Sequence, residues 1–258
     1  MADAIILELV HALRKGQPKM GVHKLHNELQ ELLMPHDMAI GRNRLNKLLR
    51  DHKLLVQPAK RKPRTTNSRH RFRKWPNLVR ELKPNRPEQI VVADITYWRI
   101  ERGFIYIALI TDTYSHMVLG YNISEDLFLT GALSALEMML EGRVYPDSDM
   151  IHHSDKGSQY CSNPYIDMLL DHNIGISMTE AKQGENTVAE RINGILKQDF
   201  GLPDRFDDYR SAVGPITEAI RTYNYEYPHG SINYLKPYQA HRISGPIKRR
   251  WKYKKRKT

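Results

Sequence analysis

The chain has 258 residues, a formal net charge of +11 and a single cysteine, Cys161. This length allows one sizeable hydrophobic core beside a small accessory domain, and one cysteine excludes a disulfide framework or a cysteine-rich zinc module within the chain. No apolar run approaches 18 residues and no leader-like segment opens the sequence, so it predicts no membrane span and a reducing, cytoplasmic setting.

The charge is unevenly divided along the chain. Residues 88–245 carry 12 Lys and Arg against 22 Asp and Glu, a net charge of −10, whereas the two flanking segments carry 28 against 7, a net charge of +21. Basic flanks around an acidic centre are expected where the flanks bind a polyanion and the centre binds cations. The distribution therefore favours a nucleic-acid-binding protein.

Residues 1–57 are expected to form a small helical domain. Three stripes of apolar residues at helical spacing begin near residues 5, 22 and 45, with breaks at 15–18 and 34–37. A helix-turn-helix-like DNA-binding domain is predicted, with a plain helical bundle as the alternative. The third helix carries the side-chain types that a recognition helix presents to a major groove, namely Arg42, Asn43, Arg44, Asn46 and Lys47.

Two segments are strongly basic and poor in aliphatic residues, so neither can fold alone. Residues 58–86 are predicted to be a linker that also binds DNA, and residues 246–258 a tail in which aromatic residues suit base stacking beside phosphate contact. A purely electrostatic tail is the alternative. The cations expected to contact DNA are Lys60, Arg61 and Lys62 in the linker and Lys248, Arg249 and Arg250 in the tail.

Residues 87–245 are predicted to form an α/β core. Strands are expected at 90–100, 105–111, 117–123, 150–153 and 174–178, and helices at 129–140, 164–172, around residue 190 and at 207–224. The order βββαβαβαα describes a mixed five-stranded sheet flanked by helices. It is the order of ribonuclease-H-like nucleases.

Three acidic residues of this core are candidates for binding divalent cations. Asp94 follows four apolar residues in the first strand, where a carboxylate is unfavourable unless a cation or hydrogen-bond donors compensate it. Asp155 follows a short strand, and Glu190 lies in a helical segment with Lys197 two turns further on the same face. Each acid also has a structural alternative: a hydrogen-bonded sheet residue, a turn residue and, for Glu190, a capping box with Thr187.

The order of four motifs carries a family resemblance. The motifs are Asp-Ile-Thr-Tyr from residue 94, His-Ser-Asp-x-Gly-Ser-Gln-Tyr from 153, Glu-Asn-x-x-x-Glu-Arg-x-Asn-Gly-x-Leu-Lys from 185 and Tyr-Asn-x-x-x-Pro-His from 223. Over residues 22–237 the chain resembles the two-frame bacterial insertion-sequence transposases, whose second-frame product has a retroviral-integrase-like core. The resemblance implies a metal-binding catalytic triad of Asp94, Asp155 and Glu190. His153 and Lys197, which flank these acids, are candidates for contact with DNA phosphates.

The resemblance also implies the reaction and the partners. The expected enzyme nicks insertion-sequence ends with water and then transfers the freed 3′-OH to a second phosphodiester, using two Mg²⁺ ions for which Mn²⁺ is a plausible substitute. Its partners would be double-stranded terminal inverted repeats and target DNA, further copies of the chain in at least a dimer, and an upstream-frame DNA-binding protein, separate or fused. Such a protein would act in the bacterial cytoplasm, at the nucleoid.

Two details qualify this interpretation. Between Asp155 and Glu190 there are 34 residues, one fewer than is usual in the family. Asp112 is a fourth acid and is interpreted as structural. The competing functions are a ribonuclease-H-like nuclease without strand transfer and a catalytically impaired protein that binds element ends.

Overall fold

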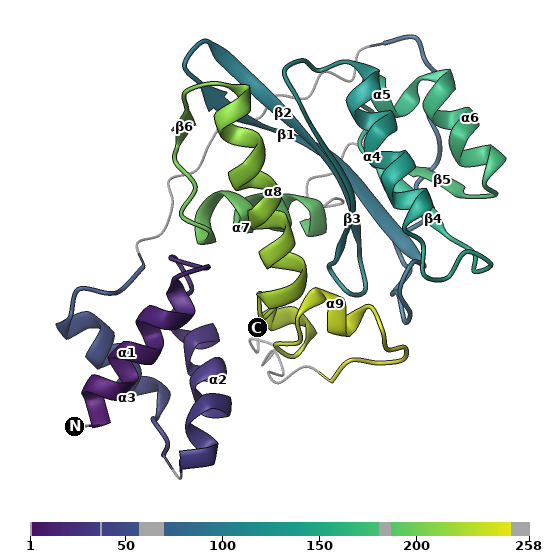
Figure 1. Ribbon diagram of the computed structural model, residues 1–258. Coiled ribbons are helices and arrows are strands. Elements are labelled where there is room, and N and C mark those ends of the chain that lie inside the picture. The colour runs from purple at the N-terminus through teal and green to yellow at the C-terminus, as the bar shows by residue number, and fades with distance from the viewer. Residues whose placement is uncertain (1, 37, 57–69, 181–186, 249–258) are drawn as a thin grey trace, which may run out of the picture.

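Figure 1 shows the computed structural model of the chain, which describes residues 2–36, 38–56, 70–180 and 187–248. The helices of its N-terminal part are α1 (Ala2–Arg14), α2 (Val22–Leu33), the 3₁₀ helix η1 (Met34–His36) and α3 (Arg42–Asp51). The remaining elements are β1 (Ile90–Ile100), β2 (Gly103–Asp112), β3 (Val118–Ser124), α4 (Leu129–Glu141), β4 (Ile151–Ser154), α5 (Ser158–Cys161), α6 (Asn163–Asp171), β5 (Gly175–Met178), α7 (Thr187–Asp199), β6 (Arg205–Phe206), α8 (Tyr209–Glu226), η2 (Gly230–Ile232) and α9 (Pro237–Ala240).

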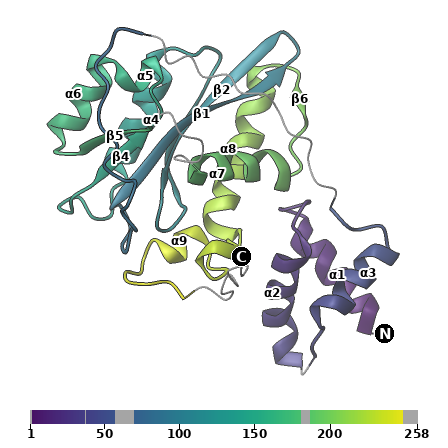
Figure 2. The same cartoon turned by 180° about the vertical axis from the view of Figure 1, so that it is seen from behind.

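The three N-terminal helices occupy the positions that the apolar stripes predict. Their inward faces meet in a hydrophobic cluster of their own, in which Leu25, Leu29 and Leu45 are fully buried. The three-helix group lies to one side of the sheet in both views (Figures 1 and 2). Burial of this cluster supplies the main stabilisation of helices that would be marginal in isolation.

Ion pairs join the N-terminal helices to the rest of the chain. Lys24 Nζ of α2 lies 2.9 Å from Asp199 Oδ2 at the end of α7, and Lys236 Nζ, just before α9, lies 3.1 Å from Glu28 Oε2 of α2. All four side chains are at most about one-fifth exposed, so solvent screens these pairs less than it screens surface pairs. The N-terminal helices are therefore docked on the core.

The core is a mixed sheet in the order β3-β2-β1-β4-β5. β1 is antiparallel to β2 and parallel to β4, and β5 continues the sheet parallel to β4. This confirms the predicted mixed sheet, with one addition: β6 pairs in parallel with the end of β1 and makes a sixth strand. A two-residue strand has no side-chain periodicity that a sequence pattern could detect.

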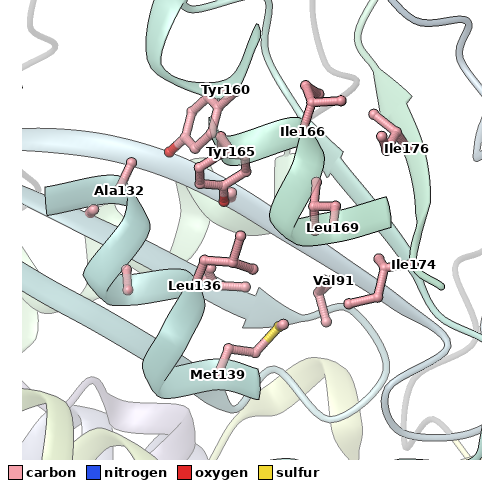
Figure 3. Close-up of a cluster of buried hydrophobic side chains, with 14 of the residues drawn as sticks. Val91, Ala132, Leu136, Met139, Tyr160, Tyr165, Ile166, Leu169, Ile174 and Ile176 are labelled. Atoms are coloured by element: carbon pink, nitrogen blue, oxygen red, sulfur yellow. The ribbon is translucent and has the colours of Figure 1, made fainter. Parts of the chain in front are cut away.

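Helices cover both faces of the sheet (Figures 1 and 2). Val91 and Ala93 of β1 join the cluster beneath α4, α5 and α6, which Figure 3 shows, whereas Trp98 joins the cluster beneath α7 and α8. Alternation of side chains along a strand produces this division. α4 packs so closely that a Cβ on Gly120 of β3 would lie 2.1 Å from the carbonyl oxygen of Ala135, so this contact requires glycine.

Part of the predicted linker lies along the sheet edge. The Met178 amide of β5 donates to the Pro76 carbonyl, and the Leu78 amide donates to Ser177 Oγ. His70 Nε2 lies 2.7 Å from the carbonyl oxygen of Lys156, next to Asp155. Residues 70–78 thus cover the edge strand β5, which protects its backbone groups from unwanted pairing.

A buried polar network ties the start of β1 to the loop after α4 and to α9. Glu88 and Asp112 are both 0% exposed. Asp112 accepts hydrogen bonds from the Glu88 amide at 2.7 Å and from the Ser115 hydroxyl at 2.7 Å, and Ser115 Oγ also lies 2.9 Å from His241 Nδ1. These contacts confirm the structural interpretation of Asp112.

The carboxylate of Glu88 neutralises a buried arginine in this network. Arg143 Nε donates to Glu88 at 3.2 Å, and the Val144 amide donates to it at 2.7 Å. Burial alone would raise the pKa of Glu88, but hydrogen bonds from His241, Val144 and Arg143 outweigh it and hold the pKa below its ordinary value. The charged form is therefore the one that the fold stabilises.

None of the helices within the described residues is long and apolar enough to cross a membrane.

Glu88→Gln is expected to lower the free energy of unfolding by about 3 kcal/mol at pH 7, because Arg143 would keep a buried charge without a counter-charge. Since the pKa of Glu88 is lowered in the folded state, its contribution is full at neutral pH, begins to fall below the ordinary glutamate value of about 4.3 and is lost as the pH passes through the lower folded pKa. Urea denaturation at a series of pH values from 7 downward, through the folded pKa, measures both effects. The matched control is Glu218→Gln, whose exposed pair with Arg221 predicts no measurable shift of the midpoint. Equal midpoint shifts in the two variants would contradict the assigned role of Glu88.

Candidate active site

A pocket of about 340 Å³ opens beside the middle of β1. Two of the predicted acids, Asp94 and Asp155, line it together, although 61 positions separate them in the sequence. The other lining residues are Ile95, Thr96, Tyr97, Phe104, Tyr106, Leu127, Gly157, Ser158, Gln159 and Tyr160.

The parallel pairing of β1 with β4 brings these two acids together. Ala93 is the register partner of Ser154, the last residue of β4, so Asp94 and Asp155 each follow a paired position on neighbouring strands. The Gly157 amide donates to Asp155 Oδ1 at 2.8 Å, and a Cβ on Gly157 would lie 2.9 Å from that oxygen. The Asp-x-Gly spacing of the motif therefore has a steric reason.

Asp94 faces α7 across the sheet surface. Asn193 Nδ2 of α7 donates to Asp94 Oδ2 at 2.6 Å, and Lys197 Nζ, one turn further, donates to Thr96 Oγ1. Lys197 also lies 5.1 Å from the centroid of the Tyr97 ring. The polar face of α7 is thus directed at the central strand, as the spacing of Glu190 and Lys197 suggests.

Glu190 lies in the first turn of α7 and is exposed. The helix begins at Thr187, which places this residue inside the helix rather than at its N-cap. The preceding position, residue 186, and the rest of the shortened loop lie outside the described residues. The capping-box alternative for Glu190 depends on residues outside the described part of the chain and stays a prediction.

Mutual repulsion among the acids contributes to the raised pKa of Asp94. Burial raises the pKa of Asp94 to about 7, and the charges of Asp155 and Glu190 act in the same direction. A hydrogen bond from the Ile95 amide and the charge of Lys197 oppose them only in part. The site thus carries more negative charge than its own cations and donors neutralise.

Carboxylate oxygens in such a setting are the ligands that hard divalent cations prefer. Within residues 2–36, 38–56, 70–180 and 187–248, no three His, Cys, Asp or Glu side chains stand close enough together to hold an ion. Asp94 and Asp155 form the fixed part of the acidic site, and Glu190 acts on it through its charge.

His153 does not reach the surface. Its side chain is 0% exposed, and Nδ1 lies 2.9 Å from Ser177 Oγ of β5. A ring so enclosed between neighbouring strands cannot contact a DNA phosphate in this conformation, which corrects the prediction for His153. β4 has strands on both sides and helices over it, so both histidines of its sequence are buried.

The predicted recognition helix presents its polar residues to solvent. Arg42, Asn43, Arg44 and Lys47 are exposed, and Asn46 is half-buried. Three of them, Arg42, Asn43 and Arg44, border a pocket of about 390 Å³ that Tyr234 of the core also lines. Lys248 is exposed as well. The remaining predicted DNA contacts lie outside the described residues: Lys60, Arg61, Lys62, Arg249 and Arg250.

The sequence interpretation did not identify the aromatic wall of the pocket. Tyr97, Phe104 and Tyr106 come from the two strands of the β1–β2 hairpin, and Tyr160 follows the Asp155 turn. Aromatic residues in both of the strands predicted at 90–100 and 105–111 were the available signal. Their residue types are equally common in buried strands, so the sequence alone could not show that these side chains border a pocket.

Comparisons with known proteins relate the core to integrase domains. The family "Integrase core domain" matches residues 84–183, and a second family of the same description matches residues 172–237. The "Insertion element IS600 uncharacterized 31 kDa protein" of Shigella sonnei is 31% identical over 242 residues, which cover 91% of this chain and 86% of that protein. The transposase of insertion sequence IS629, also from Shigella sonnei, is 37% identical over 140 residues, which cover 53% of this chain and 46% of that protein.

The fold also has a counterpart of known structure. The simian T-cell lymphotropic virus intasome, solved by cryo-electron microscopy in complex with PP2A regulatory subunit B56 gamma, contains a chain that superposes with a TM-score of 0.52. The superposition covers 88% of this chain and 77% of that chain at 18% identity. On the combined match in sequence and fold, the chain belongs to the bacterial insertion-sequence transposases with an integrase-like, ribonuclease-H-like catalytic core.

Proposed function

We propose that the chain is a DNA transposase that nicks insertion-sequence ends and transfers the freed 3′-OH to a second phosphodiester, with Asp94, Asp155 and Glu190 as its catalytic triad. The observation that supports this proposal is that Asp94 of β1 and Asp155 at the end of β4 line one pocket, where the charge of Glu190 from α7 also acts on Asp94. A polynucleotidyl transferase needs such a concentration of carboxylates to hold divalent cations at phosphorus.

The residues of the site fit Mg²⁺. Asp94 and Asp155 offer oxygen ligands on the wall of one pocket, and the charge of Glu190, in the first turn of α7, acts on the same site. Two bound Mg²⁺ ions, for which Mn²⁺ can substitute, would stabilise the attacking and leaving oxygens of an in-line displacement.

The chain's own residues would orient the DNA for both steps. In the first step the oxygen of a water molecule bonds to phosphorus and the P–O3′ bond breaks, which leaves a 3′-OH and a 5′-phosphate. In the second step that 3′-OH attacks another phosphodiester and displaces its 3′ oxygen. Asn193 fixes the Asp94 carboxylate through its 2.6 Å hydrogen bond, and Lys197 supplies positive charge for a phosphate on the same face of α7.

The basic parts of the chain would hold the DNA. Exposed Arg42, Asn43, Arg44 and Lys47 of α3 are proposed to contact the terminal inverted repeats, together with half-buried Asn46. The division into a helical domain (1–57), a linker (58–86), a catalytic core (87–245) and a tail (246–258) is part of the proposal. Two ends must be held at once, so the active form is at least a dimer, and an upstream-frame protein or fusion would add a further DNA-binding domain.

Asp94→Asn, Asp155→Asn and Glu190→Gln are each expected to reduce nicking and joining at least about 1,000-fold, because each removes a metal-binding carboxylate. The measurement uses purified protein, Mg²⁺ and a labelled end duplex, with a gel shift to establish that DNA binding persists. Glu137→Gln, an exposed glutamate of α4, is the matched control and should keep wild-type activity. Nicking without joined product would identify a nuclease, and a shift without cleavage would identify an end-binding protein.

Asp94→Asn is also expected to stabilise the metal-free protein by on the order of 2 kcal/mol at pH 8. The folded state raises the pKa of Asp94, so its charge opposes folding above about pH 7, and this penalty disappears as the pH falls toward the ordinary value for aspartate. Urea denaturation in EDTA at pH 8 and pH 5 should therefore show a difference that shrinks at the lower pH. Mg²⁺ should raise the Tm of the wild type and leave that of the variant unchanged. A variant less stable than wild type at pH 8 would contradict the assumed repulsion.

Arg42→Ala and Lys47→Ala are expected to weaken binding of an end duplex and to reduce the dependence of log Kd on log salt by about one unit for each lost phosphate contact. Fluorescence anisotropy at several salt concentrations measures both quantities. Lys15→Ala, an exposed lysine between α1 and α2, is the control that removes the same charge elsewhere. If all three variants lose affinity equally, α3 has no special part in DNA binding.

A further inference from the structure

One wall of the acidic pocket is apolar and solvent-accessible. It comprises Tyr97 of β1, Phe104 and Tyr106 of β2, and Leu127 and Phe128 just before α4, a group that we call the apolar shelf. Its first four members line the pocket together with Asp94 and Asp155, and Phe128 adjoins Leu127 in the chain. The acids and an apolar surface thus border the same space.

The shelf exists because the β1–β2 hairpin is longer than the helix that covers it. On this face of the sheet, Ala93, Ala108 and Ile110 are buried beneath α4, but the side chains nearer the hairpin turn are not part of that cluster. Tyr97 and Tyr106 are register partners, and the Tyr97 and Phe104 rings meet edge to face with centroids 5.2 Å apart. The result is a continuous aromatic surface with one side open.

The loop before α4 is held in place by hydrogen bonds. The Phe128 amide donates to Asp126 Oδ1 at 3.1 Å, and the Ser124 hydroxyl donates to the Asp126 carbonyl at 2.8 Å. Gln159 Nε2, from the helix that follows Asp155, donates to the Leu127 carbonyl at 2.8 Å. The loop is therefore fixed both internally and to the acidic turn.

This fixed loop keeps large apolar side chains in water. Phe128 is 69% exposed, Leu127 46% and Phe104 40%. Clustered exposure of this kind indicates a binding surface, because single exposed apolar residues are common but contiguous ones are not. The shelf needs an occupant that is flat, apolar on its faces and located beside a phosphodiester.

We infer that the apolar shelf binds an unstacked nucleobase of the DNA end, next to the phosphodiester that the acids cleave; this rests on the proposed function. Every base has a π-face that stacks on aromatic side chains, and such stacking contributes about 1–3 kcal/mol per base. Bases inside a duplex are already stacked, so the base must leave its neighbours to reach the shelf. Lys197, 5.1 Å from the Tyr97 ring, adds positive charge for the phosphate that accompanies the base.

The test places 5-iodouracil, which on irradiation cross-links to an aromatic side chain that stacks on it, at each position around the cleaved phosphodiester of a labelled end duplex. Wild-type protein should give a cross-link signal at one position, and Phe104→Ala should abolish that signal. Phe104→Ala should also reduce nicking of paired ends about 10- to 100-fold, the loss of one stacked base. Phe104→Trp should restore both, and Leu170→Ala, which removes a 50% exposed side chain of α6 away from the pocket, should change neither.

DNA ends with a mismatch at the position that gives the signal provide the second comparison. Because the base at that position is already unpaired, the Phe104→Ala variant should nick these ends several-fold faster than it nicks fully paired ends. Equal nicking rates on the two substrates, or nicking by the wild type with no position that gives a signal, would overturn the inference while leaving the proposed function in place.

If the wild type gives the signal without nicking, base binding by the apolar shelf is supported and the proposed function fails. If Phe104→Ala instead alters the oligomeric state in the absence of DNA and keeps the wild-type signal, the shelf is a contact between copies of the chain and the inference is wrong.

Discussion

The central constraint of this structure is the carboxylate of Asp94 in the middle of the central strand. Burial and two neighbouring acids raise its pKa to about 7, so at neutral pH the site holds charge that the fold does not stabilise. Such strain persists only where the surrounding structure fixes it. The parallel register of β1 with β4 brings Asp155 to the same level, and Asn193 of α7 holds the carboxylate from above. Sheet and helix together keep close to one another groups that would separate in a free chain.

The strand that carries this penalty is also the one most heavily stabilised. β1 pairs with three strands, and its alternating side chains enter both hydrophobic clusters, with Ala93 on one face and Trp98 on the other. Glu88 and Asp112 fix the start of β1. Glu88 neutralises Arg143 in the loop after α4, and Asp112 accepts a hydrogen bond from the Glu88 amide. The same network reaches His241 at the end of α9 through Ser115. A destabilising carboxylate is tolerable in this position because the backbone around it cannot relax without loss of much of the core.

Much of the fold was predictable, since the long elements have strong periodicity: the predicted limits of β1 are those observed, and α4, α6 and α8 lie within two residues of their predictions. The short α5, β6 and α9 were not predicted, because two to four residues show no period; β4 and β5 are as short as α5 and α9, and apolar residues at their starts indicated them. For the site, the sequence indicates which acids are candidates, and strand pairing determines which of them meet.

His153 illustrates the limit of sequence-based prediction. A polar residue beside a candidate acid suggests contact with ligand, but β4 is enclosed on both faces, and burial lowers the pKa of its neighbour His152 to about 3. The apolar shelf is the converse case. Its residue types are typical of a core, but these side chains stay exposed because α4 does not extend over them.

α7 connects the acidic pocket with the N-terminal helices. Its first turn carries Glu190, its middle holds Asp94 through Asn193, and its last residue, Asp199, pairs with Lys24 of the N-terminal helices and accepts a hydrogen bond from Tyr227. A helix of 13 residues spans about 20 Å, and it behaves as a rigid rod over that length. Together with the ion pair of Lys236 and Glu28, α7 therefore fixes the position of the three N-terminal helices relative to the acids. The ion pair at Asp199 is consequently as much a part of the geometry of the site as the register of the strands.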